Sequence, residues 1–408
     1  MKIAFVLSSF PVVSETFIVN QICALIDQGH EVTIFTFQKN QDVIIHESVQ
    51  TYNLMDKLVV FEPEPSNKWM RFRNFWRVIF GGGRKYDLSK IFTVLNFFKY
   101  GKKALSLHFF YKVQWFLQKD HFDVIHCHFA PSGLFIARLK RDGFLNSEKL
   151  VTSFHGTDIN PGKVEEYKTK YQVLFNEMDI FTYNSEYTLQ IIKQVVANSE
   201  KLRLLPVGLD TAHFRKTREE LIQGPVQIVY CGRLVPFKGP DLAVEIVRKL
   251  VERKNDLHFT IIGTGDLLEV VKDLIDKYQL YEYVTLKGAV SQEEIIQIMD
   301  ESDIFLLPGI HDNISGRAEN QGLVIQEAQA MQLPVVVSNA GGMKYGLIDG
   351  ETGFVVNEKD LDGFVEKLEV LIRDKGLRDI MGKKGREYIV EKFDSKILGE
   401  QLISYYSE

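Results

Sequence analysis

Residues 301–356 of this 408-residue chain read ESDIFLLPGIHDNISGRAENQGLVIQEAQAMQLPVVVSNAGGMKYGLIDGETGFVV. The short apolar run Ile304–Leu307 has the pattern of a strand that is buried on both faces. After a loop that begins at Pro308, an apolar-periodic helix opens near Gly322 and stops before Pro334, where a second apolar run begins. Strand, loop, helix and strand in this order predict a βαβ unit of a parallel sheet.

Two acids of this unit, Glu319 and Glu327, stand on either side of the predicted helix start. Parallel sheets bind ligands at the carboxyl ends of their strands, where helix N-termini point. The free N–H groups and the positive dipole end at Gly322 suit a phosphate. A ligand that spans both acids must be elongated and hydroxyl-rich at each end, as a nucleotide sugar is. The alternative is that both acids are solvated residues on a helix surface.

The motifs of this stretch resemble those of a known family. E-x7-E followed by E-A-x-A-M-x-x-P-V-V, then by G-G and D-G-x-T-G-F, is similar to the family-4 retaining glycosyltransferases, and the likeness covers nearly the whole chain. The resemblance implies the GT-B fold, an α/β architecture of two Rossmann-like parallel-sheet domains that face a cleft. It implies an acceptor domain over 1–208, a nucleotide-sugar donor domain over 209–385, and a C-terminal helix over 386–408 that crosses back to the first domain.

The bulk composition is typical of a soluble globular protein. With 45% apolar and 25% charged residues, the chain is long enough for two cores of ordinary size. The net charge of −5 argues against nucleic acid as a general partner. Three scattered cysteines form no metal-spaced cluster and fit a reduced cytoplasmic setting. We find neither a signal-peptide core nor an apolar run long enough to cross a membrane, and therefore expect a cytoplasmic protein.

The first predicted strand, Lys2–Leu7, leads into a loop that lacks the dinucleotide-binding pattern G-x-G-x-x-G. The loop reads FPVVSETF over 10–17 and resembles a subset of the family that acts in bacterial exopolysaccharide and lipopolysaccharide assembly, of the colanic-acid type. We expect Ser14, Glu15 and Thr16 to face the cleft and to contact the acceptor or the donor phosphate. Alternatively, Ser14 simply caps the helix that follows.

Basic and aromatic residues interleave over 66–119, where lysines and arginines far outnumber the single acid, Asp87, and where all three tryptophans lie. Such a pattern at helical spacing favours a surface that docks on anionic lipid, which places the protein at the inner face of the cytoplasmic membrane. One alternative is a helical subdomain with an aromatic core and a cationic rim. A surface for single-stranded nucleic acid is another.

Histidines end two of the predicted strands of the first domain. His155 precedes Gly156 at the carboxyl end of a strand, where a Rossmann-like domain places its site. The resemblance assigns this H-G position to the cleft, near the reacting sugar, and adds His128 and Asp158 as acceptor-side candidates. His126 and His128 alternate across the preceding strand and could be structural. A zinc site of these histidines lacks a companion ligand at a typical spacing.

Two cations in the second domain are five positions apart after its first predicted strand. Arg233 and Lys238 stand beside glycines and could hold a diphosphate, the arginine as a fork and the lysine as a point charge. The alternative is a solvated turn with two cations. The same spacing in family-4 enzymes holds the donor diphosphate, and a later Gly263-x-Gly265 turn resembles the family loop near the base.

The resemblance implies roles for further residues. The expected catalytic residues are His155, Arg233, Lys238 and Glu319. Glu319 is expected to hold the hexose hydroxyls and Glu327 the ribose diol. The residues expected to bind the donor are Gly232, Gly263, Gly265, Asn320, Gly322, Leu323, Val324 and Glu327.

The expected function is retaining transfer of a hexose or N-acetylhexosamine from a nucleotide sugar to a lipid-linked oligosaccharide in bacterial surface-polysaccharide biosynthesis. The resemblance favours UDP over GDP as the nucleotide. The motifs hold no Asp-x-Asp pair, so we expect no cofactor and no divalent metal. One alternative is a non-catalytic nucleotide-sugar or glycan-binding partner of the same fold. Another is a different GT-B enzyme, such as a nucleotide-sugar epimerase or a phosphorylase.

Overall fold

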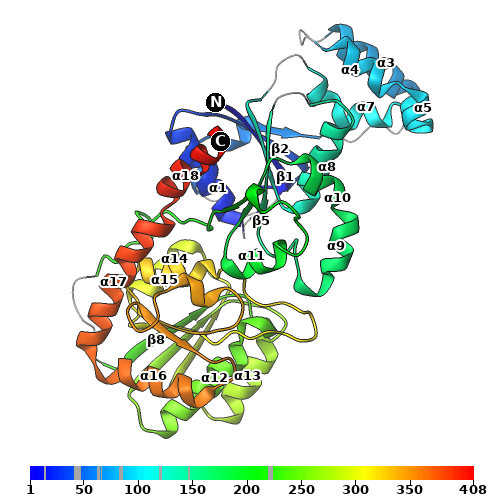
Figure 1. Cartoon of the computed structure of the whole chain (residues 1–408). Coiled ribbons are helices and arrows are strands. Elements are labelled where there is room, and N and C mark those ends of the chain that lie inside the picture. Colours follow the sequence, from blue (N-terminus) through cyan, green and yellow to red (C-terminus); the bar gives the residue numbers. More distant parts are fainter. Residues whose placement is uncertain are drawn as a thin grey trace.

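The computed structural model shows two domains, each built on one parallel sheet with helices packed around it (Figure 1). The structure describes residues 1–12, 15–40, 47–61, 65, 67–81, 86–118, 122–145, 148–218 and 224–408. The predicted site residue Ser14 lies outside these ranges. The two-domain GT-B architecture expected from the sequence is confirmed.

The N-terminal domain has a seven-stranded parallel sheet of order β3-β2-β1-β4-β5-β6-β7. Its strand order reverses between β1 and β4, which is the position where such sheets bind ligands. The sequence predicted six of these strands. It missed β3, a three-residue edge strand with only half-buried side chains. The strands are β1 (Lys2–Phe10), β2 (Glu31–Lys39), β3 (Leu58–Val60), β4 (Val124–His128), β5 (Lys149–Phe154), β6 (Ile180–Tyr183) and β7 (Leu202–Leu204).

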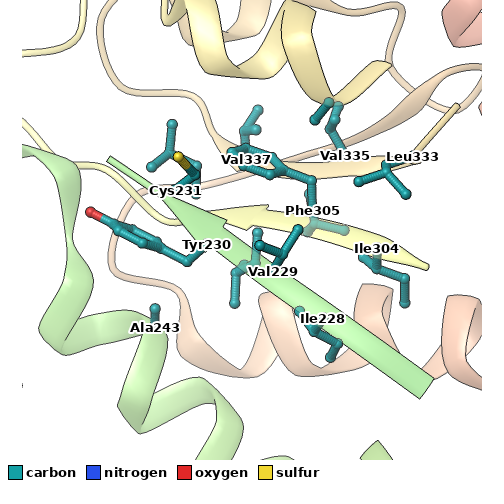
Figure 2. Close-up of a cluster of buried hydrophobic side chains, with 14 of the residues drawn as sticks. Ile228, Val229, Tyr230, Cys231, Ala243, Ile304, Phe305, Leu333, Val335 and Val337 are labelled. Atoms are coloured by element: carbon teal, nitrogen blue, oxygen red, sulfur yellow. The ribbon is translucent and has the colours of Figure 1, made fainter. Parts of the chain in front are cut away.

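The C-terminal domain has a six-stranded parallel sheet of order β10-β9-β8-β11-β12-β13, whose order reverses between β8 and β11. Figure 2 shows the centre of its core, where side chains of β8 lie against Phe305 of β11 and Val337 of β12. The four residues of β11 are buried on both faces, as their sequence predicted. The strands are β8 (Val226–Cys231), β9 (Leu257–Ile262), β10 (Val284–Gly288), β11 (Ile304–Leu307), β12 (Val335–Ser338) and β13 (Gly353–Val356).

Helices connect the strands of both sheets. Those of the N-terminal domain are α1 (Thr16–Asp27), α2 (Glu47–Thr51), α8 (Ala130–Arg141), α9 (Val164–Lys170), α10 (Gln172–Glu177) and α11 (Glu186–Ile192). Those that follow β8 are α12 (Pro240–Glu252), α13 (Leu268–Lys277), α14 (Gln292–Asp300), α15 (Leu323–Ala330), α16 (Leu361–Arg373), α17 (Lys375–Phe393) and α18 (Ser395–Ser407). Among the described residues, no helix combines the length and the hydropathy needed to span a bilayer.

The basic and aromatic segment forms a cluster of helices between β3 and β4. Figure 1 shows this cluster at the end of the N-terminal domain that lies away from the C-terminal domain. Its inner side chains, among them Phe75 and Phe110, join the core of the N-terminal domain. The helices are α3 (Lys68–Gly81), α4 (Leu88–Val94), α5 (Phe97–Tyr100), α6 (Lys102–Leu105) and α7 (His108–Val113), followed by a 3-10 turn over Gln114–Leu117.

The chain crosses between the domains twice, and the two crossings lie side by side. Leu209 on the way out pairs with Asp394 on the way back, and the Leu209 N–H donates to the carbonyl oxygen of Phe393 at 3.0 Å. The C-terminal segment is two helices rather than the single crossing helix expected over 386–408. Asp394 separates them because its backbone is extended and its carboxylate accepts the Lys396 N–H at the start of α18. Of these two helices, α18 is the one that covers α1 of the first domain (Figure 1).

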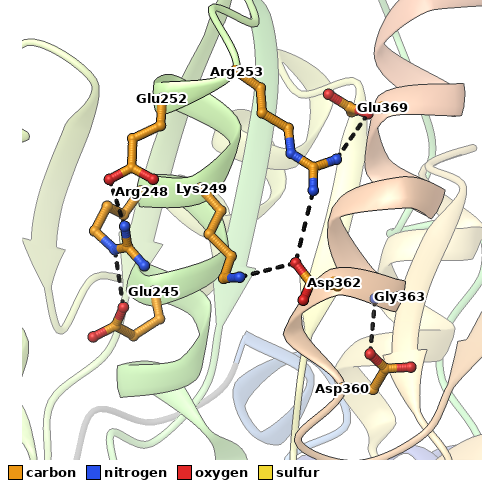
Figure 3. A network of polar contacts seen from close by, with 9 residues as sticks. All are labelled: Glu245, Arg248, Lys249, Glu252, Arg253, Asp360, Asp362, Gly363 and Glu369. Atoms are coloured by element: carbon orange, nitrogen blue, oxygen red, sulfur yellow. Dashed lines mark hydrogen bonds and ion pairs between the residues drawn. The ribbon is translucent and has the colours of Figure 1, made fainter.

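One exposed face of the C-terminal domain carries a network of ion pairs between α12 and α16 (Figure 3). Lys249 Nζ lies 2.9 Å from Asp362, and Arg253 lies 3.4 Å from Glu369. Exposed pairs of this kind contribute little to stability. None of the four residues lines the cleft described next, so this network is part of a solvated surface.

Candidate active site in the interdomain cleft

A cleft of about 550 Å³ separates the two domains. Its lining includes residues that follow four parallel strands: Glu15 after β1, His155 after β5, Arg233 after β8 and Glu319 after β11. The carboxyl ends of both sheets therefore face each other across the cavity, as two domains of this type require for a shared ligand.

Arg233 and Lys238 line the C-terminal wall of the cleft. The Arg233 side chain is exposed in the cavity, and its guanidinium lies 5.8 Å from the ring centre of Phe237. Gly239, which follows Lys238, has a φ of +63°, and a Cβ there would stand 2.1 Å from the carbonyl oxygen of Pro308. A glycine is therefore needed for the loops after β8 and β11 to approach each other, and their approach sets the position of Lys238.

Lys238 forms an ion pair with Glu319, with Nζ and Oε2 2.5 Å apart, and both side chains are largely buried. Burial alone would raise the pKa of Glu319. The charge and hydrogen bond of Lys238, the Asn320 N–H and the nearby Arg233 outweigh that effect and lower the pKa below its ordinary value. Glu319 is therefore a carboxylate at neutral pH, and it can accept hydrogen bonds from ligand hydroxyl groups.

The backbone around Glu319 is held by the glycine pair that follows β12. The Gly342 N–H donates to the carbonyl oxygen of Glu319 at 2.7 Å. A Cβ at Gly341 would stand 2.1 Å from the same oxygen, and Gly341 has a φ of +60°. These glycines therefore lie behind Glu319 and fix its position.

Helix α15 begins at the cleft as its sequence predicted. Gly322 is the N-cap with a φ of +76°, and Gly322 and Leu323 line the cavity, so unpaired N–H groups of the first turn point toward it. Val324 is buried and does not line the cavity. Glu327, one turn further on, also lies behind the lining. Burial raises its pKa to about 7, and the charge of Lys238 opposes that rise.

The predicted donor residues Gly232, Gly263 and Gly265 are not among the lining residues of the cavity; Gly263 packs against Gly232, and Gly265 packs against Leu234. A Cβ at Gly263 would stand 1.9 Å from the Gly232 carbonyl oxygen, and one at Gly265 would stand 2.6 Å from that of Leu234. The Gly232 N–H donates to Ile262 at 3.0 Å. Their contribution is close contact between the loops after β8 and β9, which fixes the loop that carries Arg233.

Three histidines form a row beneath the N-terminal wall. His155 lines the cleft, and its Nε2 lies 2.9 Å from Nδ1 of His128, whose ring is parallel to it within 3° with ring centres 5.1 Å apart. His126 lies deeper and is hydrogen-bonded at 2.6 Å to both Ser153 and Tyr406. Burial lowers the pKa of His155 and of His126 to about 3 and that of His128 well below its ordinary value. The imidazoles are therefore neutral, and His155 can offer a hydrogen bond but no charge.

Asp158 positions the His155 loop from below. Its carboxylate accepts N–H groups from His155 and Gly156, both at 3.1 Å, and from Ala130 at the start of α8 at 2.8 Å. Burial raises its pKa to about 6 although these three amides lower it. Asp158 does not line the cavity, so the structure places it under the site rather than at the acceptor.

Of Glu15 and Thr16, the two residues of the predicted first-loop set that the structure describes, Glu15 lines the cleft. It stands at the N-cap position of α1, but its side chain caps no backbone N–H there. Burial raises its pKa to about 7. Thr16 is the first residue of the helix and does not line the cavity. A carboxyl group with a pKa of about 7 therefore lies on the N-terminal side of the cleft.

Two residues of the Glu319 loop, Asn320 and Gln321, join the domains. Only Asn320 was among the site residues predicted from the sequence, where it was expected to bind the donor. Gln321 is buried, and its side-chain amide exchanges two hydrogen bonds with the backbone of Val207, at 2.7 and 2.8 Å. The predicted residue Asn320 packs over Gly156, where a Cβ would stand 2.0 Å from its side chain. A glutamine in a polar loop gives no sequence signal for such a contact.

Two further cations of the lining were not predicted. Lys163 on the N-terminal side and Arg317 on the C-terminal side are exposed in the cavity. With Arg233 and Lys238 they make four cations against two acids among the lining residues, so the cavity suits an anionic ligand. Arg317 stands two residues before Glu319 in the sequence, and this position could have indicated that it lines the cleft.

Metal-binding geometry was searched for in the described part of the chain. No group of three or more His, Cys, Asp or Glu side chains there could hold a metal ion, and this includes the three histidines of the N-terminal wall. Their hydrogen bonds to one another and to Ser153 and Tyr406 account for the arrangement.

Comparison with known proteins agrees with this arrangement of the chain. Residues 14–213 match the model of Glycosyltransferase Family 4, and residues 213–388 match that of Glycosyl transferases group 1. The two matches meet at residue 213, between β7 and β8.

Two bacterial relatives match most of the chain. A putative colanic acid biosynthesis glycosyltransferase, WcaL of Salmonella typhimurium, is 29% identical over 99% of both chains. The amylovoran biosynthesis glycosyltransferase AmsK of Erwinia amylovora is 30% identical over 88% of both.

Solved structures show the same fold at lower sequence identity. HepE of Anabaena in complex with UDP superposes over the whole of both chains with a TM-score of 0.71 at 16% identity. A glycosyltransferase of Rickettsia africae gives 0.69 at 17% identity over 99% of this chain and 97% of its own. Taken with the 30% identity to AmsK and the two family models, these matches show that the chain belongs to the family-4 glycosyltransferases of GT-B fold.

Proposed function

We propose that this glycosyltransferase moves a hexose or an N-acetylhexosamine from a nucleotide sugar to a lipid-linked oligosaccharide, with retention of anomeric configuration, in the assembly of a bacterial surface polysaccharide. The observation that carries the proposal is the C-terminal wall of the cleft. Arg233, Lys238 and the free N–H groups at the start of α15 converge there beside the carboxylate of Glu319.

The chemistry of transfer matches this wall. The bond between the anomeric carbon and the diphosphate oxygen breaks, a bond to the acceptor oxygen forms, and the acceptor proton leaves with the diphosphate. Negative charge develops on the leaving oxygen, and preorganised cations and N–H groups aimed at it supply a large part of the rate. Arg233 is free to act as a fork on the diphosphate, and Lys238 adds a point charge.

The sugar lies between the two walls in this proposal. Glu319 accepts hydrogen bonds from its hydroxyl groups, and neutral His155 offers another from the opposite wall. Front-face attack, in which the acceptor enters on the side that the leaving group departs from, needs no carboxylate nucleophile. The charge that a divalent ion would supply comes from side chains, so activity is expected to survive EDTA.

UDP is our first expectation for the nucleotide, and GDP is the specific competitor. HepE superposes on the chain with UDP bound, but at an identity that carries the fold alone. A GDP-mannose-dependent mannosyltransferase of Mycolicibacterium smegmatis is 28% identical over 68% of this chain. The polysaccharide pathways named for WcaL and AmsK support a lipid-linked glycan as the acceptor class.

The test is release of nucleoside diphosphate from a panel of UDP- and GDP-sugars, with and without EDTA and with and without a crude lipid-linked acceptor. We expect release from one donor that depends on the acceptor and continues in EDTA. Proton NMR of the product should then show the anomeric configuration of the donor. Lys249→Ala, which removes an exposed lysine outside the cleft, is the control for Lys238→Ala.

Several outcomes contradict parts of the proposal. Loss of release in EDTA overturns the metal-independent mechanism, and an inverted product overturns front-face attack. Tight nucleotide binding without release from any donor makes the chain a binding partner rather than a transferase. Interconversion of the sugar without any acceptor makes it an epimerase.

A further inference from the structure

One face of α3 is an exposed row of aromatic rings. Trp69, Phe72, Trp76 and Phe80, which we call the aromatic stripe, recur every three or four residues and are 73%, 55%, 45% and 76% exposed. The rings of Phe72, Trp76 and Phe80 touch one another along the helix, since Trp76 is stacked on Phe80 at 5.4 Å and meets Phe72 edge-on at 6.0 Å. With exposed Trp69 one turn before Phe72, they form an apolar ridge on the surface.

The opposite face of α3 is firmly attached to the N-terminal domain. Phe75 is buried against Phe110, with ring centres 4.7 Å apart. The Tyr111 hydroxyl donates to the carbonyl oxygen of Arg71 at 2.7 Å, and the Arg71 side chain reaches His108 at 2.7 Å. Because the helix is fixed by this face, the aromatic stripe is held outward and cannot turn into the core.

The neighbouring helices extend the apolar surface. Phe98 of α5 is 99% exposed, and the other apolar side chains of this distal patch are Leu88, Phe92, Phe97 and Leu105 on α4, α5 and α6. Figure 1 shows these helices gathered at the end of the N-terminal domain that points away from the cleft. An apolar surface of this extent marks an interaction site, because monomeric proteins rarely expose one.

Positive charge accompanies the aromatic stripe on the same helix. Lys68, Arg73 and Arg77 are exposed, and none of them forms an ion pair with a residue that the structure describes. The single acid of the segment, Asp87, is engaged in capping α4 through the Ser89 N–H. This differs from the α12–α16 surface, where exposed cations are matched by acids (Figure 3). The cations of α3 are therefore available to bind an anionic partner.

We propose that α3 docks the enzyme on the surface of an anionic phospholipid bilayer. The helix lies in the plane of the interface, the aromatic stripe enters the boundary between headgroups and acyl chains, and the three cations meet lipid phosphates. The distal patch makes the second point of contact. A lipid explains both features together, since it offers an apolar layer and a negative surface within the thickness of one helix.

Docking of this kind holds the N-terminal domain, which carries Glu15 and His155, at the surface where a lipid-linked acceptor resides. The link to that acceptor rests on the proposed function, whereas docking itself does not. Membrane binding is therefore tested without any sugar, and transfer is tested separately.

The test is co-sedimentation of the full chain with vesicles of phosphatidylcholine alone and vesicles that also contain phosphatidylglycerol. We expect binding to the anionic vesicles, with a blue shift of tryptophan emission, because all three tryptophans of the chain lie in this segment. Phe72→Ser with Phe80→Ser should weaken binding by about a hundredfold or more, since each buried aromatic ring contributes at least about tenfold. The matched control is Val270→Ser with Ile380→Ser, which removes two exposed apolar side chains of the C-terminal domain.

A second set of variants tests the charge. Lys68→Gln, Arg73→Gln and Arg77→Gln together should weaken anionic-vesicle binding by about fivefold for each cation. Lys193→Gln, Lys277→Gln and Lys383→Gln make the same change at exposed lysines elsewhere and should have little effect. The α3 cation variants should also lose most of the salt dependence of binding.

Three outcomes overturn the proposal. The first is no preference for the anionic vesicles, and the second is equal loss of binding in the stripe variants and their controls. The third is a dimer that the stripe variants convert to monomers, because a second copy would then cover the stripe. Nucleoside diphosphate release with a water-soluble acceptor analogue should be unchanged in the stripe variants. Docking variants that keep this activity separate a failure of docking from a failure of the proposed transfer.

Discussion

The two walls of the cleft are built on similar parallel sheets but differ in their electrostatics. The C-terminal wall presents Arg233 and the Lys238–Glu319 ion pair. The N-terminal wall carries one exposed cation, Lys163, and presents His155, whose imidazole is kept neutral by burial and backed by His128. We call it the neutral wall after this imidazole. The first wall is suited to hold and stabilise charge, and the second to orient a hydroxyl group through hydrogen bonds.

This difference has a structural cause. The charged groups follow β8 and β11, where glycines such as Gly239 and Gly341 allow loops to pack tightly around Lys238 and Glu319. The neutral wall is instead fixed by side chains of its own sheet and of α18, through His126 and Tyr406. In the proposed function the charged wall holds the diphosphate and, through Glu319, part of the sugar, while the neutral wall orients a hydroxyl group, and the predictions below test that division.

Loss of a charge from the C-terminal wall should have the largest effect. Lys238→Ala should lower turnover by at least about a hundredfold, in line with the loss of one preorganised charge at the leaving group. Steady-state kinetics, with the donor that the release assay identifies, would measure this loss of turnover. Lys249→Ala on the α12–α16 surface should change turnover less than twofold by the same assay. An unchanged rate in Lys238→Ala would remove this lysine from the mechanism.

Glu327 lies behind the residues that line the cleft, so its expected contact with the ribose needs a direct test. If that contact forms, Glu327→Gln should weaken donor binding by about ten- to a hundredfold, the value of a charge-assisted hydrogen bond. It should also make the free protein more stable at alkaline pH. The pKa of Glu327 is raised from 4.5 to about 7, so the folded state binds its proton more tightly than the unfolded state does. Wild-type stability therefore falls as the pH rises from about 4.5 through 7.

The melting temperature checks this sign directly. Glu327→Gln should melt a few degrees above the wild type at about pH 8, and the two should coincide at about pH 4, where both are uncharged at this position. Donor titration by calorimetry measures the loss of affinity. A variant that binds donor normally would show that Glu327 has no contact with the nucleotide.

Tyr406→Phe tests the support of the neutral wall. The Tyr406 hydroxyl is hydrogen-bonded at 2.6 Å to fully buried His126, and its loss leaves a ring nitrogen without a partner. The free energy of unfolding should fall by about 1–3 kcal/mol, as measured by urea denaturation. Tyr281→Phe on an exposed site is the control and should change it little. Equal effects of both variants would mean that the buried hydrogen bond does not stabilise the wall.

Asp362→Asn should have the smallest effect. It removes the exposed acid that faces Lys249 and Arg253 in Figure 3, and exposed pairs contribute little to stability. Unfolding at low and high salt measures the difference, which should shrink as salt increases. A change in turnover would show that charges outside the cleft affect catalysis. The electrostatic difference between the two walls would then not be enough to explain the rate.

The sequence predicted the fold and the charged wall because the signals for both are local. Buried strands such as Ile304–Leu307 are continuous apolar runs, and Arg233, Lys238 and Glu319 follow strands at short, fixed distances along the chain. Glycines at Gly322 and Gly239 mark the helix starts that shape this wall. Each of these inferences needed only a few neighbouring residues.

The neutral wall and the contacts between domains depend on residues far apart in the chain. The partner of His126 is Tyr406, and that of Gln321 is the backbone of Val207. No local pattern shows that a buried glutamine will span two domains. The membrane role of the insert stays a prediction, although the structure confirms that the segment is helical and leaves its aromatic stripe exposed.

The crossing of α18 onto the first domain has a consequence for synthesis of the protein. The face of α1 that α18 covers is made early, but α18 follows the whole C-terminal domain. At the usual rate of translation, on the order of tens of seconds separate the two. The N-terminal domain therefore cannot complete its core as it leaves the ribosome, and the second domain must be made before the first is finished.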